Sequence, residues 1–209
     1  EEEFIEDKTK DFTYILFLGK FNDELQSLEK RVINLGGISD KDDEEDKVFN
    51  ENHPNIHRHR IKGYKCYAFI LVDDVKPKSL TNLIRKVDII IFTFNLNKPK
   101  TLKFLKKEWF QIIKKVDEKQ PKNQERFLIG IYPKGSKANE YNLSEIYSKF
   151  ENIKKELNCT KYFEYGTKPK NLNIPSKMKT PPRLIQYLSN NLIKEEEEKS
   201  SSEEEKEEQ

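Results

Sequence analysis

The sequence predicts an α/β domain built on a doubly wound, mostly parallel sheet of six strands, with one antiparallel strand at its edge. Short apolar runs of strand length alternate with longer segments whose apolar residues recur at helical spacing. Two strand-like segments are separated only by Lys62 and Gly63, which indicates a hairpin. Helical segments join the remaining strands, and such crossover connections place strands parallel to one another.

The first predicted strand covers residues 14–18, a continuous apolar run that ends at Gly19. A helix should follow, because four apolar residues recur at helical spacing: Leu25, Leu28, Val32 and Leu35. It should end at Gly36 and Gly37, since glycine commonly follows a helix. Residues 40–46 are mostly acidic and contain no large apolar side chain, so we expect a mobile acidic loop over residues 38–55.

The middle of the chain should supply three strands and a long helix. Residues 56–62 and 64–72 form the predicted hairpin, and residues 87–96 carry the strongest strand signal, flanked upstream by a short helix over residues 79–86. The long helix should cover residues 101–116. Its apolar face consists of Leu102, Leu105, Trp109, Ile112 or Ile113, and Val116.

Two further strands, over residues 127–132 and 161–165, should lie on either side of an amphipathic helix over residues 143–157. Pro181 and Pro182 should open a final helix that ends near residue 193, since proline is tolerated in the first helical turn. We expect three parts in the chain. They are an acidic N-terminal extension (1–12), one domain (13–194) and a disordered acidic tail (195–209).

Charge is unevenly distributed along the chain. Residues 195–209 hold nine Glu and two Lys, and removing them from the 39 basic and 37 acidic residues leaves a net charge of +9 on residues 1–194. A basic body favours acidic partners. No apolar stretch approaches the roughly 20 residues of a membrane-spanning helix, and residues 1–7 are acidic, so we expect neither a membrane span nor a signal peptide. Cys66 and Cys159 lie in strand-like segments, as reduced core thiols do.

Four segments share a family resemblance: Tyr14-Ile15-Leu16-Phe17-Leu18-Gly19, Val87-Asp88-Ile89-Ile90-Ile91-Phe92, Phe127-Leu128-Ile129-Gly130 and Tyr162-Phe163-Glu164-Tyr165-Gly166-Thr167-Lys168. In this order they resemble the first, fourth, fifth and sixth strands of Ras-like small GTPases. Pro99, Thr101, Leu102 and Trp109 are spaced as in the helix that follows the fourth strand of that family. The resemblance covers most of residues 13–193 and implies a Ras-like fold of the P-loop NTPase type.

The nucleotide-binding motifs that this resemblance implies are degenerate. In the phosphate-loop pattern G-x-x-x-x-G-K-[ST], counted from Gly19, the second glycine falls on Glu24, the lysine on Leu25 and the Mg²⁺-holding hydroxyl on Gln26. Glu24 would place a carboxylate against a polyphosphate, and Leu25 removes the cation that neutralises it. The base-reading Asn-Lys-x-Asp falls on four residues that offer no carboxylate to guanine: Ile131, Tyr132, Pro133 and Lys134.

The remaining loops of the family are also altered. After the third strand, Asp73 or Asp74 could match the family's Mg²⁺-bridging Asp, but Lys76 or Pro77 replaces the Gly that senses the γ-phosphate. Residues 165–168 keep some likeness to the family's Ser-Ala-Lys. We therefore expect no nucleotide, no other cofactor and no catalytic residue.

The resulting hypothesis is a pseudo-GTPase, a non-catalytic scaffold or adaptor that binds protein partners within a larger assembly. The candidate partner surface is the outer face of the long helix, formed by Lys103, Lys106, Lys107, Lys114 and Lys115. The abundance of Lys, Asn and Ile is typical of an AT-rich genome, such as a protist's. We expect a cytoplasmic location, and this composition adds a cytoskeletal or ciliary assembly as a candidate setting.

Two other functions stay open. One is a divergent nucleotide-binding GTPase or another α/β enzyme, with a pocket at the carboxyl ends of the strands and an unrecognised phosphate grip. The other is a basic nucleic-acid- or lipid-binding module, although no RNA-binding aromatic motif or recognition-helix signature is present. His53, His57 and His59 cluster in sequence, but no cysteine or second ligand pair lies near them, so we expect no metal site.

Overall fold

The structure, a computed structural model, describes residues 11–19, 23–36, 44–71, 77–119, 124–174 and 183–194. The strands within them are β1 (Thr13–Leu18), β2 (Ile56–Arg60), β3 (Cys66–Leu71), β4 (Ile89–Asn95), β5 (Glu125–Ile131) and β6 (Lys161–Tyr165). The α-helices are α1 (Asp23–Ile33), α2 (Glu44–Asn52), α3 (Thr81–Lys86), α4 (Pro99–Lys119), α5 (Leu143–Glu156) and α6 (Leu184–Asn191).

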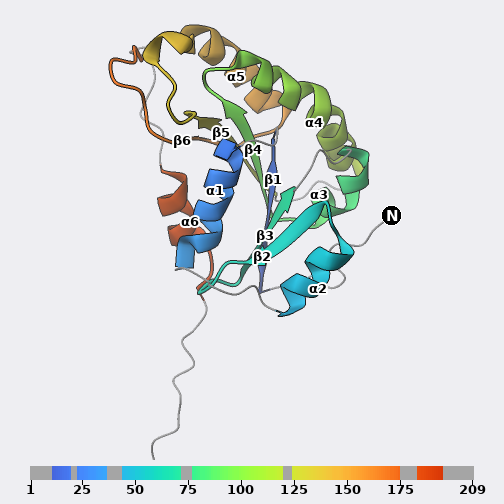
Figure 1. Cartoon of the computed structure of the whole chain (residues 1–209). Coiled ribbons are helices and arrows are strands. Elements are labelled where there is room, and N and C mark those ends of the chain that lie inside the picture. Colours follow the sequence, from blue (N-terminus) through green and yellow to red (C-terminus); the bar gives the residue numbers. More distant parts are fainter. Residues whose placement is uncertain are drawn as a thin grey trace, which may run out of the picture.

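The six strands form one sheet in the order β2-β3-β1-β4-β5-β6 (Figure 1). β2 runs antiparallel to β3, and every other neighbouring pair is parallel. The α/β class, the mostly parallel six-stranded sheet and its single antiparallel edge pair are thereby confirmed. The hairpin predicted on either side of Lys62 and Gly63 supplies that pair.

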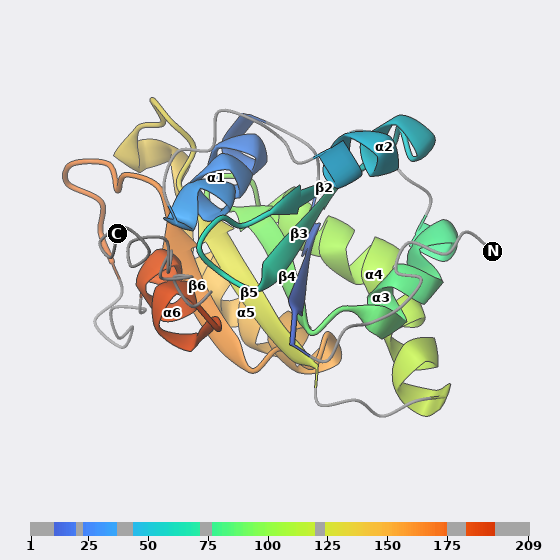
Figure 2. The ribbon, with the colours of Figure 1, turned by 90° about the horizontal axis from the view of Figure 1, so that it is seen from below.

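Helices cover both faces of the sheet, with α1 and α6 on one face and α3, α4 and α5 on the other (Figures 1 and 2). Each face has its own apolar cluster, and the alternating side chains of β1 divide between them. Ile15 and Phe17 pack with α1 and α6, whereas Leu16 packs with the other three helices. The sheet is therefore buried on both sides, which explains why its central strands are apolar throughout.

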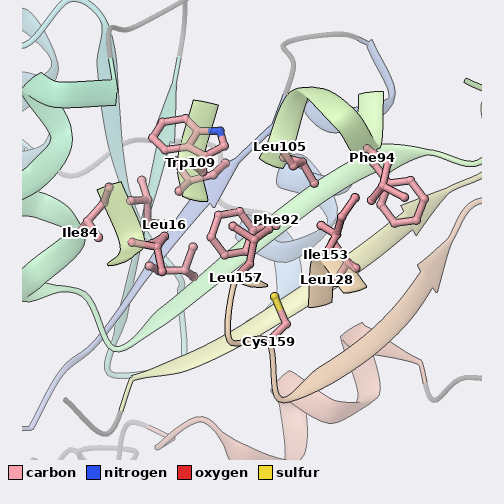
Figure 3. Packing of buried hydrophobic residues seen from close by; sticks show 14 of the residues in the cluster. Leu16, Ile84, Phe92, Phe94, Leu105, Trp109, Leu128, Ile153, Leu157 and Cys159 are labelled. Carbon is pink, nitrogen blue, oxygen red and sulfur yellow. The ribbon is translucent and has the colours of Figure 1, made fainter. Parts of the chain in front are cut away.

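β4 lies at the centre of the sheet, and all seven of its residues are buried, in agreement with the strength of its strand signal. α4 packs on it through Trp109, which is 2% exposed and lies among Leu16, Ile84 and Phe92 in Figure 3. The sequence left the fourth position of the apolar face of α4 open. Ile113 is the buried residue there, and its neighbour Ile112 is only half-buried.

The mobile loop predicted over residues 38–55 is wrong for its second part, because Glu44–Asn52 form helix α2. Buried Asp46 accepts hydrogen bonds from Arg58 Nε at 2.6 Å and from the Arg60 backbone N–H at 2.8 Å. Asn50 pairs with both backbone groups of Arg58, at 2.7 and 3.2 Å. These polar contacts and the packing of Phe49 on Phe69 hold the helix in place. Its sequence carries no periodic apolar face, so apolar periodicity did not reveal it. Residues 37–43 lie outside the described residues.

The two ends of the domain differ slightly from expectation. Phe12, which we assigned to the N-terminal extension, packs against Tyr67 with ring centroids 5.2 Å apart. The final helix is shorter than predicted, and Lys194 forms an isolated bridge with Tyr64. Residues 1–10 and 195–209 lie outside the described residues, so the extension and the tail stay predictions. In the described part of the chain, no helix combines the length and the apolarity that a bilayer crossing requires.

Both cysteines are buried thiols, as expected for core residues. Burial raises the pKa of Cys159 to about 12 and also raises the pKa of Cys66. A thiol needs its thiolate form to act as a nucleophile, so neither side chain is set up for such chemistry.

Candidate functional site

A pocket of about 850 Å³ lies at the carboxyl ends of β5 and β6. Residues 131–136, from the last residue of β5 onward, and residues 165–170, from the last residue of β6 onward, line it, and Ser27 of α1 contributes to one side. These loops contain the degenerate base-reading positions and the segment that resembles the family's last nucleotide loop. The structure brings them together in one concave site of the size that small-molecule or side-chain ligands occupy.

A buried carboxylate beneath the pocket ties its walls together. Glu164 of β6, whose side chain is 6% exposed, accepts hydrogen bonds from the hydroxyls of Tyr132 (3.0 Å), Tyr147 (3.0 Å) and Tyr162 (3.2 Å). The ammonium of Lys168 lies 3.0 Å from the same carboxylate. With three hydroxyl donors and one cation, the buried negative charge is fully satisfied.

The same arrangement keeps the three tyrosines protonated. Burial, followed by the negative charge of Glu164, raises the pKa of Tyr132, Tyr147 and Tyr162 above the ordinary tyrosine value. The hydroxyls therefore remain donors, and they connect the end of β5, helix α5 and strand β6 to one acceptor. Sequence reasoning missed this cluster. Its only local signal was that Tyr162 and Glu164, two residues apart on a strand, share one face of the sheet.

The pocket is positively charged. Among the described residues, its lining contains Lys134, Lys168 and Lys170 and no acidic residue. Lys168 is neutralised by Glu164 and lies 5.6 Å from the centre of the Tyr132 ring. Lys134 and Lys170 are exposed, and neither has an ion pair with an acidic side chain in the described ranges. Two uncompensated cations therefore face the solvent, one from each loop.

Tyr165 closes the side of the pocket next to α1. Its hydroxyl lies 3.2 Å from both the hydroxyl and the backbone carbonyl oxygen of Ser27. Its ring packs against the apolar cluster beneath α1 and α6. The contact links the end of β6 to the first helix, so the pocket has a fixed wall on this side.

The positions that the family resemblance assigns to the phosphate loop are buried or half-buried where they are described. A Cβ on Gly19 would lie only 2.0 Å from Thr93 Oγ1, so glycine here permits close packing against β4. Leu25, at the position of the expected lysine, is 3% exposed and belongs to the core. Gln26 is half-buried. Residues 20–22 and the side chain of Glu24 lie outside the described part.

The base-reading positions are likewise used for structure. Ile131 and Tyr132 are buried in opposite apolar clusters, and the Tyr132 backbone N–H donates to the Tyr165 carbonyl oxygen at 2.8 Å. Pro133 is buried, and Lys134, at the position of the base-reading Asp, is exposed at the pocket. The candidates Asp73, Asp74 and Lys76 lie outside the described residues.

The candidate partner surface on α4 is exposed along its length, at Lys103, Lys106, Lys107, Lys114 and Lys115. Three of these lysines lie within ion-pair distance of glutamates. Lys106 pairs with Glu156 of α5 at 2.7 Å, whereas the pairs formed by Lys107 and Lys114 on α4 itself are longer, at 3.9 and 4.0 Å. Exposed pairs of this kind stabilise a fold only weakly, so the surface stays available to a ligand.

The three histidines do not converge. His57 and His59 lie on β2 with ring centroids 6.1 Å apart, whereas His53 stacks on Phe49 at 4.2 Å at the end of α2. Among the described residues, no group of three or more His, Cys, Asp and Glu side chains is arranged to hold a metal ion.

Comparison with known proteins adds no relative from which a function could be carried over. Neither a protein-family model nor a curated protein matches the sequence.

Proposed function

We propose that this protein is a pseudo-GTPase, a Ras-like scaffold or adaptor domain that binds protein partners without a nucleotide cycle. The order of its elements and the antiparallel edge strand support this fold. One observation carries the functional part: where the family resemblance implies a phosphate-neutralising lysine, Leu25 is buried in the apolar core. A side chain packed there has no contact to offer a polyphosphate.

The base-reading site supports the same proposal. Guanine presents N–H donors, which a carboxylate accepts in the family, but this pocket presents the ammonium group of Lys134 at that position. The N–H donors of guanine would then face the N–H donors of Lys134, and no hydrogen bond could form between them. A guanine nucleotide would thus lack both the cation for its phosphates and the acceptor for its base.

Thermal denaturation in the presence of Mg²⁺ and millimolar GTP or GDP tests the proposal. A ligand present at 100 times its Kd stabilises a protein by about 2.7 kcal/mol, which corresponds to a rise in Tm of several degrees. We expect no rise beyond that given by the same ionic strength of sodium sulfate. A rise specific to guanine nucleotides would contradict the proposal.

The second candidate, an α/β enzyme or a divergent nucleotide-binding protein, is favoured by the pocket itself, since such proteins bind ligands at the carboxyl ends of parallel strands. The same thermal assay with ATP, CTP and UTP addresses it. The third candidate, a nucleic-acid or lipid module, predicts binding whose affinity falls steeply with salt on every polyanion. Titration with duplex DNA and with phosphatidylserine vesicles separates it from selective protein binding.

The setting is part of the proposal. We propose a cytoplasmic protein, and we name a cytoskeletal or ciliary assembly as the first place to look for its partners. Proteins that co-purify with the intact chain, compared with those retained after Lys103, Lys106 and Lys107 are changed to Glu, would identify partners that use α4. An unchanged set of partners with unchanged salt sensitivity would remove α4 from the proposal.

A further inference from the structure

We propose that the pocket at the ends of β5 and β6 is the docking site for an acidic segment of a partner protein, in which an apolar side chain is flanked by carboxylates. This inference rests on the proposed function, because it names where a partner is held. Lys134 and Lys170 are the cations that would receive the carboxylates.

The charges of the pocket select an anionic ligand. Within the part of the chain that the structure describes, three lysines and no acidic residue line it, and the buried carboxylate of Glu164 is already occupied by Lys168 and three tyrosine hydroxyls. Lys134 and Lys170 therefore have no internal counter-charge within the described chain. A ligand that brings carboxylates would supply one, and it would not compete with an existing ion pair.

The placement of the two cations favours a segment with separate charges over one compact anion. Lys134 follows β5 and Lys170 follows β6, so each projects from a different loop on a long, exposed stem. Such ammonium groups act as point charges and do not form the convergent N–H cradle that holds a phosphate. Carboxylates spaced along a peptide can meet both.

The walls between these lysines accommodate an apolar side chain. Pro169 and Tyr165 line the pocket and are only partly buried, and the Tyr165 hydroxyl already bonds to Ser27. These groups offer little hydrogen bonding through their side chains, so burying an apolar ligand group against them costs few polar contacts. Apolar walls with charges at the rim are the common anatomy of peptide-binding sites.

The Glu164 cluster makes the site preorganised. It joins Tyr132 in one wall to Lys168 in the other through a single carboxylate, with distances of 3.0 Å to each. The Tyr165 contact to Ser27 fixes the third side. A ligand that enters such a site does not need to order its walls, which lowers the entropic cost of binding.

The test measures fluorescence anisotropy of a fluorescein-labelled peptide with one Phe between two runs of four Glu, added to the full chain. We expect binding to the wild type, with Kd at least about tenfold weaker for the double variant K134E/K170E, the change expected when two rim ion pairs are lost. The matched control is K62E/K155E, which makes the same change in charge at two exposed lysines outside the pocket lining. It should retain wild-type affinity.

Two further peptides sharpen the result. Replacing every Glu of the peptide by Gln should abolish binding, and replacing its Phe by Gly should weaken binding without changing the dependence on Lys134 and Lys170. Equal losses in both double variants would show non-specific attraction to a basic protein and would overturn the proposal. So would a wild type that fails to bind the peptide.

Two other ligands could occupy the pocket, and a tail variant and the thermal assay with GTP distinguish them. If only a full-length chain with the nine Glu of residues 195–209 changed to Gln binds the peptide, the pocket's ligand is the chain's own tail, and the partner-segment proposal is overturned. If GTP raises the Tm of the wild type but not of K134E/K170E, the pocket is a nucleotide site, and the proposed function fails as well. Absence of both peptide binding and a GTP effect overturns only the docking site.

Discussion

Two buried carboxylates lie at opposite edges of the sheet, one on a helix beside β2 and one on β6, and the difference between their surroundings separates a closed edge from an open site. Asp46 of α2 sits against the edge strand β2, where it holds Arg58 and the backbone of Arg60. Glu164 of β6 holds Lys168 and three tyrosines beneath the pocket. Asp46 accepts hydrogen bonds from the polar groups of β2 that face it, the Arg58 side chain and the Arg60 backbone N–H. Glu164 is fully hydrogen-bonded by groups of the domain itself, and Lys134 and Lys170 remain exposed to solvent.

The lesson is that a buried charge has different consequences depending on which groups it neutralises. At β2 the ion pair and the paired backbone groups leave little for a ligand to contact. At β6 the carboxylate of Glu164 is enclosed by phenol hydroxyls and Lys168, so it does not pair with Lys134 or Lys170. We expect the first region to matter for stability and the second for both stability and binding.

Truncating a core side chain should lower the free energy of unfolding more than removing either carboxylate. Trp109 is 2% exposed and lies near Phe92 of β4 (Figure 3). Trp109→Ala should lower the free energy of unfolding by about 3–5 kcal/mol, because it leaves a large cavity. Urea denaturation followed by circular dichroism measures it. A loss below about 1 kcal/mol would mean that α4 is not packed as described.

Removing the carboxylate at the closed edge should have the next largest effect. Asp46→Ala leaves Arg58 without its partner and the Arg60 N–H without an acceptor, so we expect a loss of about 2–3 kcal/mol, less than for a fully buried pair because Arg58 is partly exposed. The same denaturation assay applies. Peptide binding at the pocket should be unchanged, and a parallel loss of binding would erase the distinction between the regions.

Neutralising the carboxylate at the open site should cost less stability but should change a titration. Glu164→Gln keeps an oxygen acceptor, so we expect a loss of about 1–2 kcal/mol. In the wild type, unfolded tyrosines ionise near pH 10 whereas the three buried ones have raised pKa values, so the stability they contribute is lost as pH rises above about 10. Glu164→Gln should lose less stability than the wild type as the pH rises above about 10. Ultraviolet absorbance of the phenolates should show tyrosines titrating at lower pH in the variant.

A third buried carboxylate sharpens the comparison because it has an unsatisfied oxygen. Glu29 of α1 is 3% exposed, and its Oε1 has no hydrogen-bond partner within the described residues. Burial raises the pKa of Glu29 to about 8. The folded state therefore binds the proton more tightly than the unfolded state, and stability is lost as pH rises from about 4.5 to about 8.

Glu29→Gln removes that dependence on pH. We expect the variant and the wild type to unfold alike near pH 4.5 and the wild type to lose stability relative to the variant as pH rises towards 8, by up to about 1.4 kcal/mol for each pH unit. Thermal denaturation at a series of pH values measures the difference. A constant difference across this range would show that Glu29 does not titrate there.

Much of the fold follows from the sequence because the core depends on local patterns. The alternating residues of β1 and the apolar runs of β4 mark strands that are buried on both faces, and the predicted bounds of β6 agree with the structure. Helix α2 could not be predicted in this way. Its polar contacts join Asp46 and Asn50 to residues 8 to 14 positions further along the chain, and its Phe49 packs against Phe69 of β3.

The site was predictable only in part. The resemblance singled out both loops of the pocket, but nothing in the sequence showed that Glu164 is shared by tyrosines at positions 132, 147 and 162. Such a cluster depends on tertiary packing of β5, α5 and β6. The lack of an acidic side chain among the described lining residues could be determined only once the lining was known.

The amide of Asn50 has a consequence for how this protein behaves at high concentration. By bonding to both the N–H and the C=O of Arg58, it takes the place that a neighbouring strand would occupy beside β2. A second molecule therefore meets no ready template for sheet extension at that position. Molecules that crowd together should associate mainly through their charges, so added salt, more than added denaturant, should control whether concentrated solutions stay clear.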